Sequence, residues 1–430
     1  MEPENYLIVM KKSFKLLASA IVLSVIACNK SNDPNPQANA LNIEYQSDAI
    51  VLEEGSNPVI AIDTASQVYT FQGDAFSKEP EAGETILVPG EYMRKVVSVS
   101  KSGGNYEIKT ADAALTDVIK DGELNWEITP EWDQASAIVI DGQYEVPIAN
   151  LRRRGPIEVQ YSSGGIDHLI QIEPQLEGDK INACKFTFKM AKKVGGSATA
   201  AFTAEGTVKL PTQQTQIGIS SGELKTFKSE NKGITADLKL SLSAAGTKSG
   251  SHSLKLPGVA LKIPIRFIPT PSGPVPLPIP VSIDIGIQFV TQLTMPDVNS
   301  SATASSNIAL SADAGFEYKG SSVSTSGSIG NDKFTDGTFD SGAFIGSPVD
   351  IQFGVAFPRV GLNIAGQEVA YIHTGFTTGS SLQWGPVCKK GYVKMVVEGG
   401  YELKVLGQTL AAQKETFAER NKEVKQDGCP

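Results

Sequence analysis

Three long segments in the second half of the chain alternate between apolar and polar residues, and this pattern constrains the fold most. Residues 234–243, 281–289 and 349–357 each carry an apolar side chain at every second position. Because successive side chains of an extended strand point to opposite faces, each segment predicts a strand with one apolar and one polar face. Such strands are typical of antiparallel sheets that pack one face and leave the other in water. Together they predict a β-sandwich or a barrel-like domain.

The first half of the chain favours shorter strands separated by turns. Candidate strands cover residues 68–71, 94–99, 106–110, 124–128, 144–146, 157–161 and 168–172. The segment 101–105 is typical of a hairpin turn, and residues 111–120 permit one short helix. Glycine (41 residues) and proline (24 residues) are abundant, and no long helical periodicity is visible. We therefore predict an all-β fold of antiparallel β-sandwich-type domains, the C-terminal one with long amphipathic strands.

Two further segments leave alternatives open. Eight prolines crowd residues 257–280. Proline cannot donate a hydrogen bond to a β-ladder, so it is confined to edges and extended segments. One interpretation is an edge segment packed on the sandwich, and the other is an apolar lip that touches a membrane, a hydrophobic ligand or a partner. Residues 410–424 permit either a short helix or a charged edge strand.

The N-terminus has the layout of a secretory signal. Three lysines at positions 11–15 precede an apolar run that is too short to span a bilayer. The run ends in Val25-Ile26-Ala27-Cys28, which resembles the lipobox of bacterial lipoproteins. The resemblance implies that the Cys28 thiol is acylated, that the chain is cut before Cys28, and that the lipid anchors the protein to a membrane. The start codon remains open between Met1 and Met10.

We expect four parts along the chain. Residues 1–27 form the signal peptide, and residues 28–41 lack apolar bulk and form a flexible tether. Residues 42–178 form an N-terminal β domain, and residues 179–430 form a C-terminal β-sandwich or barrel-like domain. Asn29 is not the aspartate that retains well-studied lipoproteins at the inner membrane. By that resemblance we expect the protein in the cell envelope at the outer membrane, facing either the periplasm or the cell surface.

The mature chain is acidic. The full sequence has 38 basic and 47 acidic residues and a net charge of −9; cleavage before Cys28 removes three lysines and two glutamates, which leaves 35 basic and 45 acidic residues and a net charge of −10. Binding of nucleic acid depends on clustered positive charge, so we do not expect a nucleic-acid partner. The charge fits a soluble domain outside the cytoplasm.

Three cysteines remain after Cys28. Exported compartments permit disulfides. Cys388 and Cys429 flank the final segment of the chain, so a bridge between them would hold the C-terminus in place. Cys184 lies in a strand-like stretch and suits a buried thiol. Pairing cannot be deduced from the sequence, so the Cys388–Cys429 disulfide is a hypothesis.

Motifs for enzymatic or metal chemistry are not visible in the sequence. The three histidines, at positions 168, 252 and 373, are far apart. The sequence lacks His-Glu-x-x-His, Cys-x-x-Cys and the phosphate loop. We therefore predict no catalytic residue, no metal site and no cofactor. Paired carboxylates from distant strands can still form a glycosidase site, but a sequence with dozens of acidic residues does not nominate the pair.

Five residues are weak candidates for ligand binding. Arg152, Arg153 and Arg154 form a compact basic cluster whose forked donors suit a carboxylate, a sulfate or a phosphate, although a solvated loop is the simpler interpretation. Trp126 and Trp132 can stack on sugar rings if they are exposed, whereas buried tryptophans anchor a core.

Three functions are compatible with these observations. The first is a non-enzymatic envelope lipoprotein that binds a glycan, a protein or another envelope component. The second is a carrier of a lipid or another hydrophobic ligand, because long amphipathic strands can line an apolar cavity. The third is an envelope hydrolase with a dispersed carboxylate site. We favour the first, because the anchor, the β composition and the missing motifs agree with it.

Overall fold

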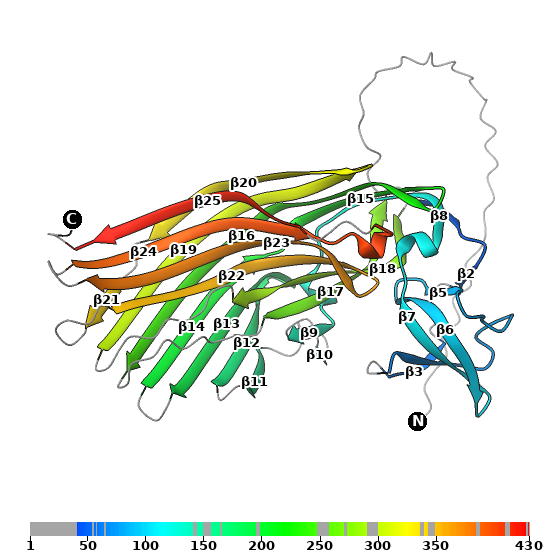
Figure 1. The fold of residues 1–430 in the computed structure, drawn as a ribbon, viewed down its shortest axis with the longest axis horizontal. Coiled ribbons are helices and arrows are strands. Elements are labelled where there is room, and N and C mark those ends of the chain that lie inside the picture. The colour runs from blue at the N-terminus through cyan, green and yellow to red at the C-terminus, as the bar shows by residue number, and fades with distance from the viewer. Residues whose placement is uncertain are drawn as a thin grey trace, which may run out of the picture. The chain divides into compact units, whose positions relative to one another are not determined.

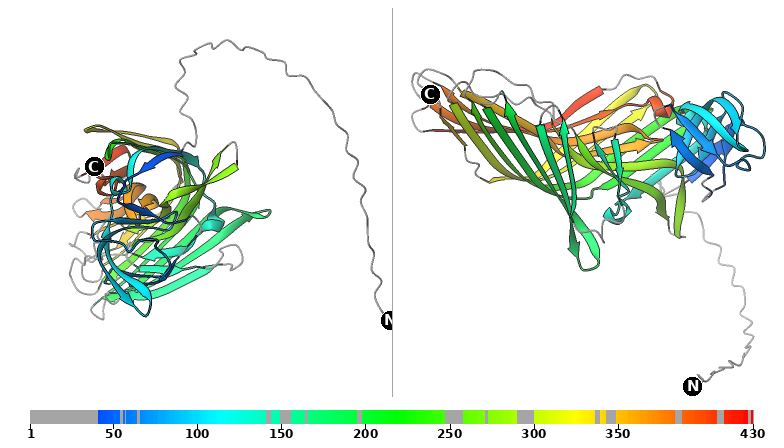
Figure 2. Two further views of the ribbon diagram at one scale, coloured as in Figure 1. Left: turned by 90° about the vertical axis from the view of Figure 1, so that its right-hand side faces the viewer. Right: turned by 90° about the horizontal axis from the view of Figure 1, so that it is seen from below.

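The alternating segments form strands of two large sheets that pack face to face (Figures 1 and 2). The computed structural model describes residues 41–53, 56, 58–63, 66–140, 144–148, 156–163, 166–194, 198–246, 258–270, 273–289, 300–335, 339–342, 349–383, 388–408, 413–426 and 429. Nearly all regular structure in these residues is β-strand, which confirms the predicted all-β fold class. In this part of the chain, no helix is long and apolar enough to cross a membrane.

The strands of the described residues form three sheets. The eleven-stranded sheet contains β1 (Leu41–Tyr45), β8 (Ile119–Ile128), β11 (Ile157–Ser163), β12 (Ile166–Glu177), β13 (Lys180–Val194), β14 (Ala198–Lys209), β15 (Thr212–Ser220), β16 (Glu223–Gly246), β19 (Ser300–Lys319), β20 (Ser322–Thr335) and β21 (Phe339–Gly342). The eight-stranded sheet contains, in spatial order, β10 (Tyr144–Pro147), β9 (Ala137–Ile140), β17 (Val259–Thr270), β18 (Gly273–Phe289), β22 (Val349–Ile364), β23 (Gln367–Gln383), β24 (Cys388–Tyr401) and β25 (Gln413–Lys425). The six-stranded sheet contains, in spatial order, β2 (Ala49–Val51), β5 (Thr85–Val88), β6 (Tyr92–Ser102), β7 (Asn105–Asp112), β4 (Val68–Phe71) and β3 (Val59–Asp63). Short 3-10 helices are η1 (Leu115–Asp117), η2 (Trp132–Gln134) and η3 (Lys404–Leu406).

β16 organises the eleven-stranded sheet. Along one side, its first part pairs with β15 and its last part pairs with β14, whereas β19 follows it along the other side. The register with β19 shifts between Asn231 and Ile234, where Gly233 has a φ of 69° that suits glycine. One long strand therefore joins two groups of shorter strands into a single sheet.

The inner faces of the two large sheets form one continuous core. The apolar members of the alternating segments whose side chains the structure describes are buried, among them Leu240 of β16 and Ile285 of β18, each 0% exposed. Aromatic rings meet across the two layers: Phe186 and Phe357 have ring centroids 5.8 Å apart, and Phe316 and Tyr401 5.5 Å apart. The predicted alternation is confirmed, and the two inner faces are in contact with each other.

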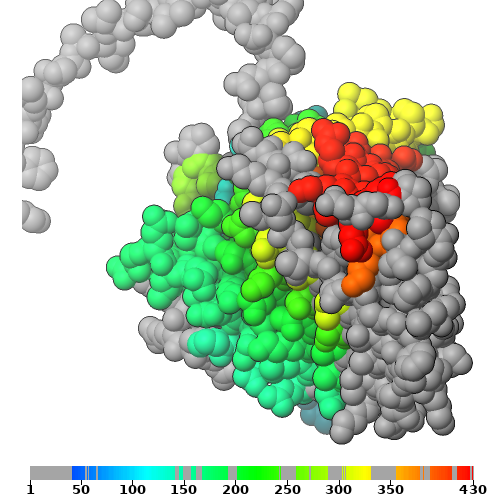
Figure 3. Space-filling model, turned by 90° about the vertical axis from the view of Figure 1, so that its left-hand side faces the viewer, coloured from blue at the N-terminus to red at the C-terminus, as the bar shows by residue number. Residues whose placement is uncertain are grey.

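The two sheets also approach each other at one edge. β20 borders the eleven-stranded sheet, β25 borders the eight-stranded sheet, and the two strands lie side by side (Figures 1 and 3). Phe417 of β25 lies against the backbone of Gly327 in β20, where a Cβ would be 2.4 Å from the Cβ of Phe417. The C-terminal segment is thus an edge strand rather than a helix, which resolves the alternative left open by the sequence.

Most of the elements predicted for the first half of the chain are present in the structure. Ser102 and Asn105 pair across a hairpin turn whose two glycines, Gly103 and Gly104, have positive φ values of 58° and 87°. The expected helix over residues 111–120 is wrong, because β7 extends to Asp112 and β8 begins at Ile119. The few residues between these strands accommodate only the 3-10 turn η1.

The predicted domain boundary at residues 178/179 falls within one sheet. β12 and β13 are adjacent antiparallel strands, and they pair from Asp167–Ala191 to Glu177–Lys180 (Figure 2). Gly178, with a φ of 61°, lies in the turn between them. The glycine and polar residues that indicated a linker are therefore hairpin-turn residues, and the structure does not divide the chain there.

The proline-rich segment is the tip of the β17–β18 hairpin. β9 pairs with β17 only up to Lys262, and β22 pairs with β18 from Val281 onward. Between these positions, in the described part of the sheet, the two strands pair with each other, as at Phe267–Pro276. Prolines are tolerated here because no outer strand requires their missing N–H groups. One face of the tip is buried, which agrees with the packed edge interpretation.

Candidate functional site

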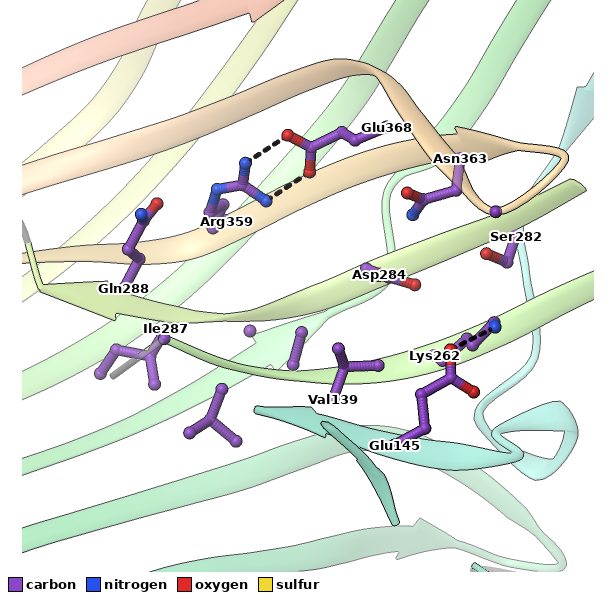
Figure 4. A pocket seen from close by; sticks show the side chains of 15 residues that line it. Val139, Glu145, Lys262, Ser282, Asp284, Ile287, Gln288, Arg359, Asn363 and Glu368 are labelled. Carbon is purple, nitrogen blue, oxygen red and sulfur yellow. Dashed lines mark hydrogen bonds and ion pairs between the residues drawn. The ribbon is translucent and has the colours of Figure 1, made fainter. Parts of the chain in front are cut away.

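A row of polar side chains crosses the outer face of the eight-stranded sheet. Asp284 of β18 pairs with Lys262 of β17 on one side and with Gly361 of β22 on the other. Directly paired residues project to the same face of a sheet. Lys262 Nζ is 2.7 Å from Oε1 of Glu145, which comes from β10 (Figure 4). The row thus begins with an ion pair and continues to a buried carboxyl group.

Gly361 makes room in this row for a second ion pair. A Cβ at position 361 would lie 2.6 Å from Oε2 of Glu368, so the carboxylate occupies the space above the glycine. Arg359 holds that carboxylate with two hydrogen bonds, from Nη1 to Oε2 at 2.6 Å and from Nη2 to Oε1 at 2.5 Å. Since Gly361 is the direct partner of Asp284, the Arg359–Glu368 pair lies beside Asp284 (Figure 4).

These side chains line a cavity of about 350 Å³. Three polar atoms of its lining residues are buried and have no hydrogen-bond partner: Asp284 Oδ1, Arg359 Nε and Asn363 Nδ2. Buried polar atoms in folded proteins are nearly always hydrogen-bonded. The three exceptions around this cavity are therefore positions where a water or a bound molecule can supply the missing partners.

The Asp284 carboxyl group has a pKa close to neutral pH. Burial is the main cause that raises its pKa, to about 7; Lys262 opposes the shift, Glu368 and Glu145 add to it, and Arg359 opposes it. Glu145–Lys262 and Arg359–Glu368 are each internally neutral. When Asp284 is protonated, the cavity carries no net charge.

The polar row continues across β23 to β25. The Arg359 guanidinium lies 4.5 Å from the centroid of the Tyr371 ring, and this ring stacks on His373 at 5.7 Å. His373 Nε2 is 3.0 Å from Oε2 of Glu398, which also binds Lys414 at 2.6 Å. Burial lowers the pKa of His373, with Glu398 partly opposing it, so the neutral imidazole donates from Nε2 to the carboxylate.

The two candidate tryptophans do not form a ligand site. Trp126 and Trp132 are each 2% exposed, so neither ring can stack on a sugar. Trp126 Nε1 donates to Oε1 of Gln213 at 2.8 Å, and Trp132 packs against Phe186 with ring centroids 6.3 Å apart. Their role as ligand-binding residues is corrected: both are core residues.

The structure describes three of the four cysteines and none of the three candidate arginines. Cys388 and Cys429 form a disulfide, the pairing hypothesised from the sequence, and it ties the segment that follows β25 to the start of β24. Cys184 is a buried free thiol. The lipidation site Cys28 and the cluster Arg152, Arg153 and Arg154 lie outside the described residues.

The residues around the cavity were not identified from the sequence. Asp284 is one of the polar residues that interleave with apolar ones in β18, a pattern that predicts exposure to water. The available signal was the pair of glycines nearby, Gly286 and Gly361, because a glycine within a strand often marks a place where another group approaches the backbone closely. In the described part of the chain, no group of three His, Cys, Asp or Glu residues is placed to hold a metal ion.

Comparison with known families assigns only the N-terminal part. Residues 32–121 match a family described as a domain of unknown function (DUF8403). Within this range the structure places β1 and the whole six-stranded sheet, so the match does not reach the cavity around Asp284. No curated protein and no solved structure matches the chain.

Proposed function

We propose that this chain is a lipid-anchored lipoprotein of the bacterial cell envelope that binds a neutral, hydroxyl-rich ligand, such as a sugar, in the cavity around Asp284. The proposal is carried by the three unpartnered buried polar atoms of Asp284, Arg359 and Asn363, which line one cavity. Binding, rather than catalysis or transport, is the proposed activity.

The chemistry of the cavity favours a neutral polyol over a charged ligand. Arg359 Nε and Asn363 Nδ2 are donors, and the protonated Asp284 carboxyl group can both donate and accept. Adjacent sugar hydroxyl groups can accept and donate at such positions. The charges of Lys262 and Arg359 are already balanced by Glu145 and Glu368. A charged ligand would therefore lose its hydration without gaining an uncompensated opposite charge.

The envelope location rests on the lipobox resemblance at Cys28, with the acidic mature chain and the disulfide in agreement. The outer membrane, in either orientation, is proposed from Asn29. Membrane fractionation of cells that produce the Cys28→Ala variant tests the anchor. The variant is expected in the soluble fraction, and wild-type protein is expected to lose its anchor under globomycin. Membrane association that survives both treatments would contradict lipid anchoring.

Ligand binding is tested by calorimetric titration of the full-length lipoprotein in detergent with neutral hexoses and N-acetylhexosamines. We expect saturable binding that Asn363→Ala weakens by about tenfold, the value of one hydrogen bond to a buried polar group. The matched control Asn421→Ala changes an exposed asparagine of β25 and is expected to bind as the wild type does. Absence of binding to every neutral sugar would contradict the proposed ligand class.

A hydrolase is the second candidate, and one observation favours it. A carboxyl group with a pKa near 7 beside another carboxylate is the arrangement of a general acid in glycosidases. Product analysis after incubation with oligosaccharides distinguishes the two functions, because turnover that Asp284→Asn abolishes would establish hydrolysis. The hydrophobic carrier has less support, since the inner faces of the two sheets are in contact through rings such as Phe186 and Phe357.

A further inference from the structure

A second cavity adjoins the one around Asp284. It has a volume of about 420 Å³, and its lining includes Tyr371 of β23, Val405 of η3 and Lys414 of β25. Glu368 lines this cavity as well as the first one, so its side chain forms a wall common to both. The two cavities are therefore neighbours that share this side chain.

Glu368 retains hydrogen-bonding capacity toward both cavities. A carboxylate offers about four lone-pair positions, and Arg359 uses one on each oxygen. The bidentate pair also fixes the orientation of the carboxylate, so the remaining positions are held in place. Hydroxyl groups on either side of Glu368 can donate to the same carboxylate.

The second cavity has chemistry that suits another sugar unit. The hydroxyl end of the Tyr371 ring lies over Gly400, where a Cβ would be 2.8 Å from Oη. Gly400 pairs with Lys414, so the tyrosine hydroxyl extends across β24 toward this lysine. Val405 and Ala370 add apolar surface. Donors and acceptors beside small apolar surfaces are the combination that ligand pockets use to orient a bound molecule.

We infer that the ligand is a linear oligosaccharide whose units occupy both cavities and cross the wall formed by Glu368. Each cavity alone lies near the lower end of the size range of ligand pockets, and the two together lie well within it. This inference rests on the proposed sugar-binding function and adds to it the length of the ligand and a second set of contacts.

The test is calorimetric titration of the full-length lipoprotein with hexoses and their linear di-, tri- and tetrasaccharides. We expect the affinity to rise at least tenfold between the best monosaccharide and its di- or trisaccharide. Lys414→Ala is expected to reduce this gain at least threefold while the affinity for the monosaccharide changes less than twofold. Lys394→Ala is the matched control, because Lys394 is a half-buried lysine that pairs with Glu419 and lines neither cavity.

Gln367→Trp is a second variant that tests the inference even if Lys414 contributes little to oligosaccharide binding. Gln367 is a partly exposed residue that lines only the second cavity, and Gln367→Trp is expected to fill it and remove the gain. Monosaccharide binding with less than a twofold gain for longer chains would overturn the two-cavity inference and leave the proposed function intact. Absence of binding to all sugars would overturn both.

Discussion

Gly361 and Glu368 are in direct contact, because a Cβ at position 361 would lie 2.6 Å from Oε2 of the glutamate. The missing side chain lets the Arg359–Glu368 pair lie flat on the sheet, beside Asp284. The glycine thus leaves room for the carboxylate that forms a wall of the cavity and for one of the two ion pairs around Asp284.

Gly361→Ala is expected to displace the Glu368 carboxylate and to break at least one of its two hydrogen bonds to Arg359. Loss of a hydrogen bond to a charged group costs about 1.5–3 kcal/mol in free energy of unfolding. Urea denaturation measures this loss. Gly375→Ala in the neighbouring strand β23 is the control, because a Cβ there would meet no atom closer than 3.6 Å. Equal stability of the two variants would show that the close contact has no energetic consequence.

Asp284→Asn is expected to change how stability depends on pH. The pKa of Asp284 rises from 3.8 in the unfolded chain to about 7 in the fold, so the unfolded state releases its proton first. The contribution of this group therefore lowers the free energy of unfolding as pH rises from about 4 to 7, by at most about 4 kcal/mol. Above pH 7 the variant should be more stable than the wild type, and the difference should shrink toward pH 4. Thermal unfolding at both pH values measures it; a difference that does not vary with pH would contradict the raised pKa.

Removal of the Cys388–Cys429 disulfide is expected to destabilise the protein by up to about 4 kcal/mol. The bridge spans a sequence separation of 41 residues, and the loop-closure entropy of a loop of that length has this magnitude. Denaturation of wild type and of the Cys388→Ser/Cys429→Ser variant, each with and without dithiothreitol, measures the effect. The reductant should lower the stability of the wild type alone. A wild type that is insensitive to complete reduction would contradict a stabilising role.

Cys184 is expected to be chemically inert in the folded protein. Burial, with a smaller effect of Asp133, raises the pKa of this thiol above its usual range, and the side chain is 0% exposed. Iodoacetamide at pH 8 should leave the Cys184 peptide unmodified in native protein and alkylate it in urea, as measured by mass spectrometry of the digest. Rapid alkylation without urea would show that the core opens readily at β13.

Local sequence patterns were sufficient for the strands and their faces. The alternation in residues 281–287 predicts that the apolar side chains of β18 share one face, because the side-chain period of a strand is two and requires no knowledge of its neighbours. The hairpin at Gly103 and Gly104 is predictable for the same reason, since turn conformation depends on adjacent residues. The boundary near residue 178 was misplaced because a hairpin turn and a linker have the same composition.

Strand pairing joins residues that are far apart in the chain, and it determined which side chains meet at the candidate site. Asp284 meets Gly361 only because β18 pairs with β22 in one register, and a shift of one residue would have placed either side chain on the opposite face. The same pairing turns an interleaved polar residue, expected in water, into a buried carboxyl group between two ion pairs. Periodicity is a property of neighbours in sequence and determines which face a side chain takes. Burial and pKa depend on neighbours in space, and only the tertiary structure brings these together.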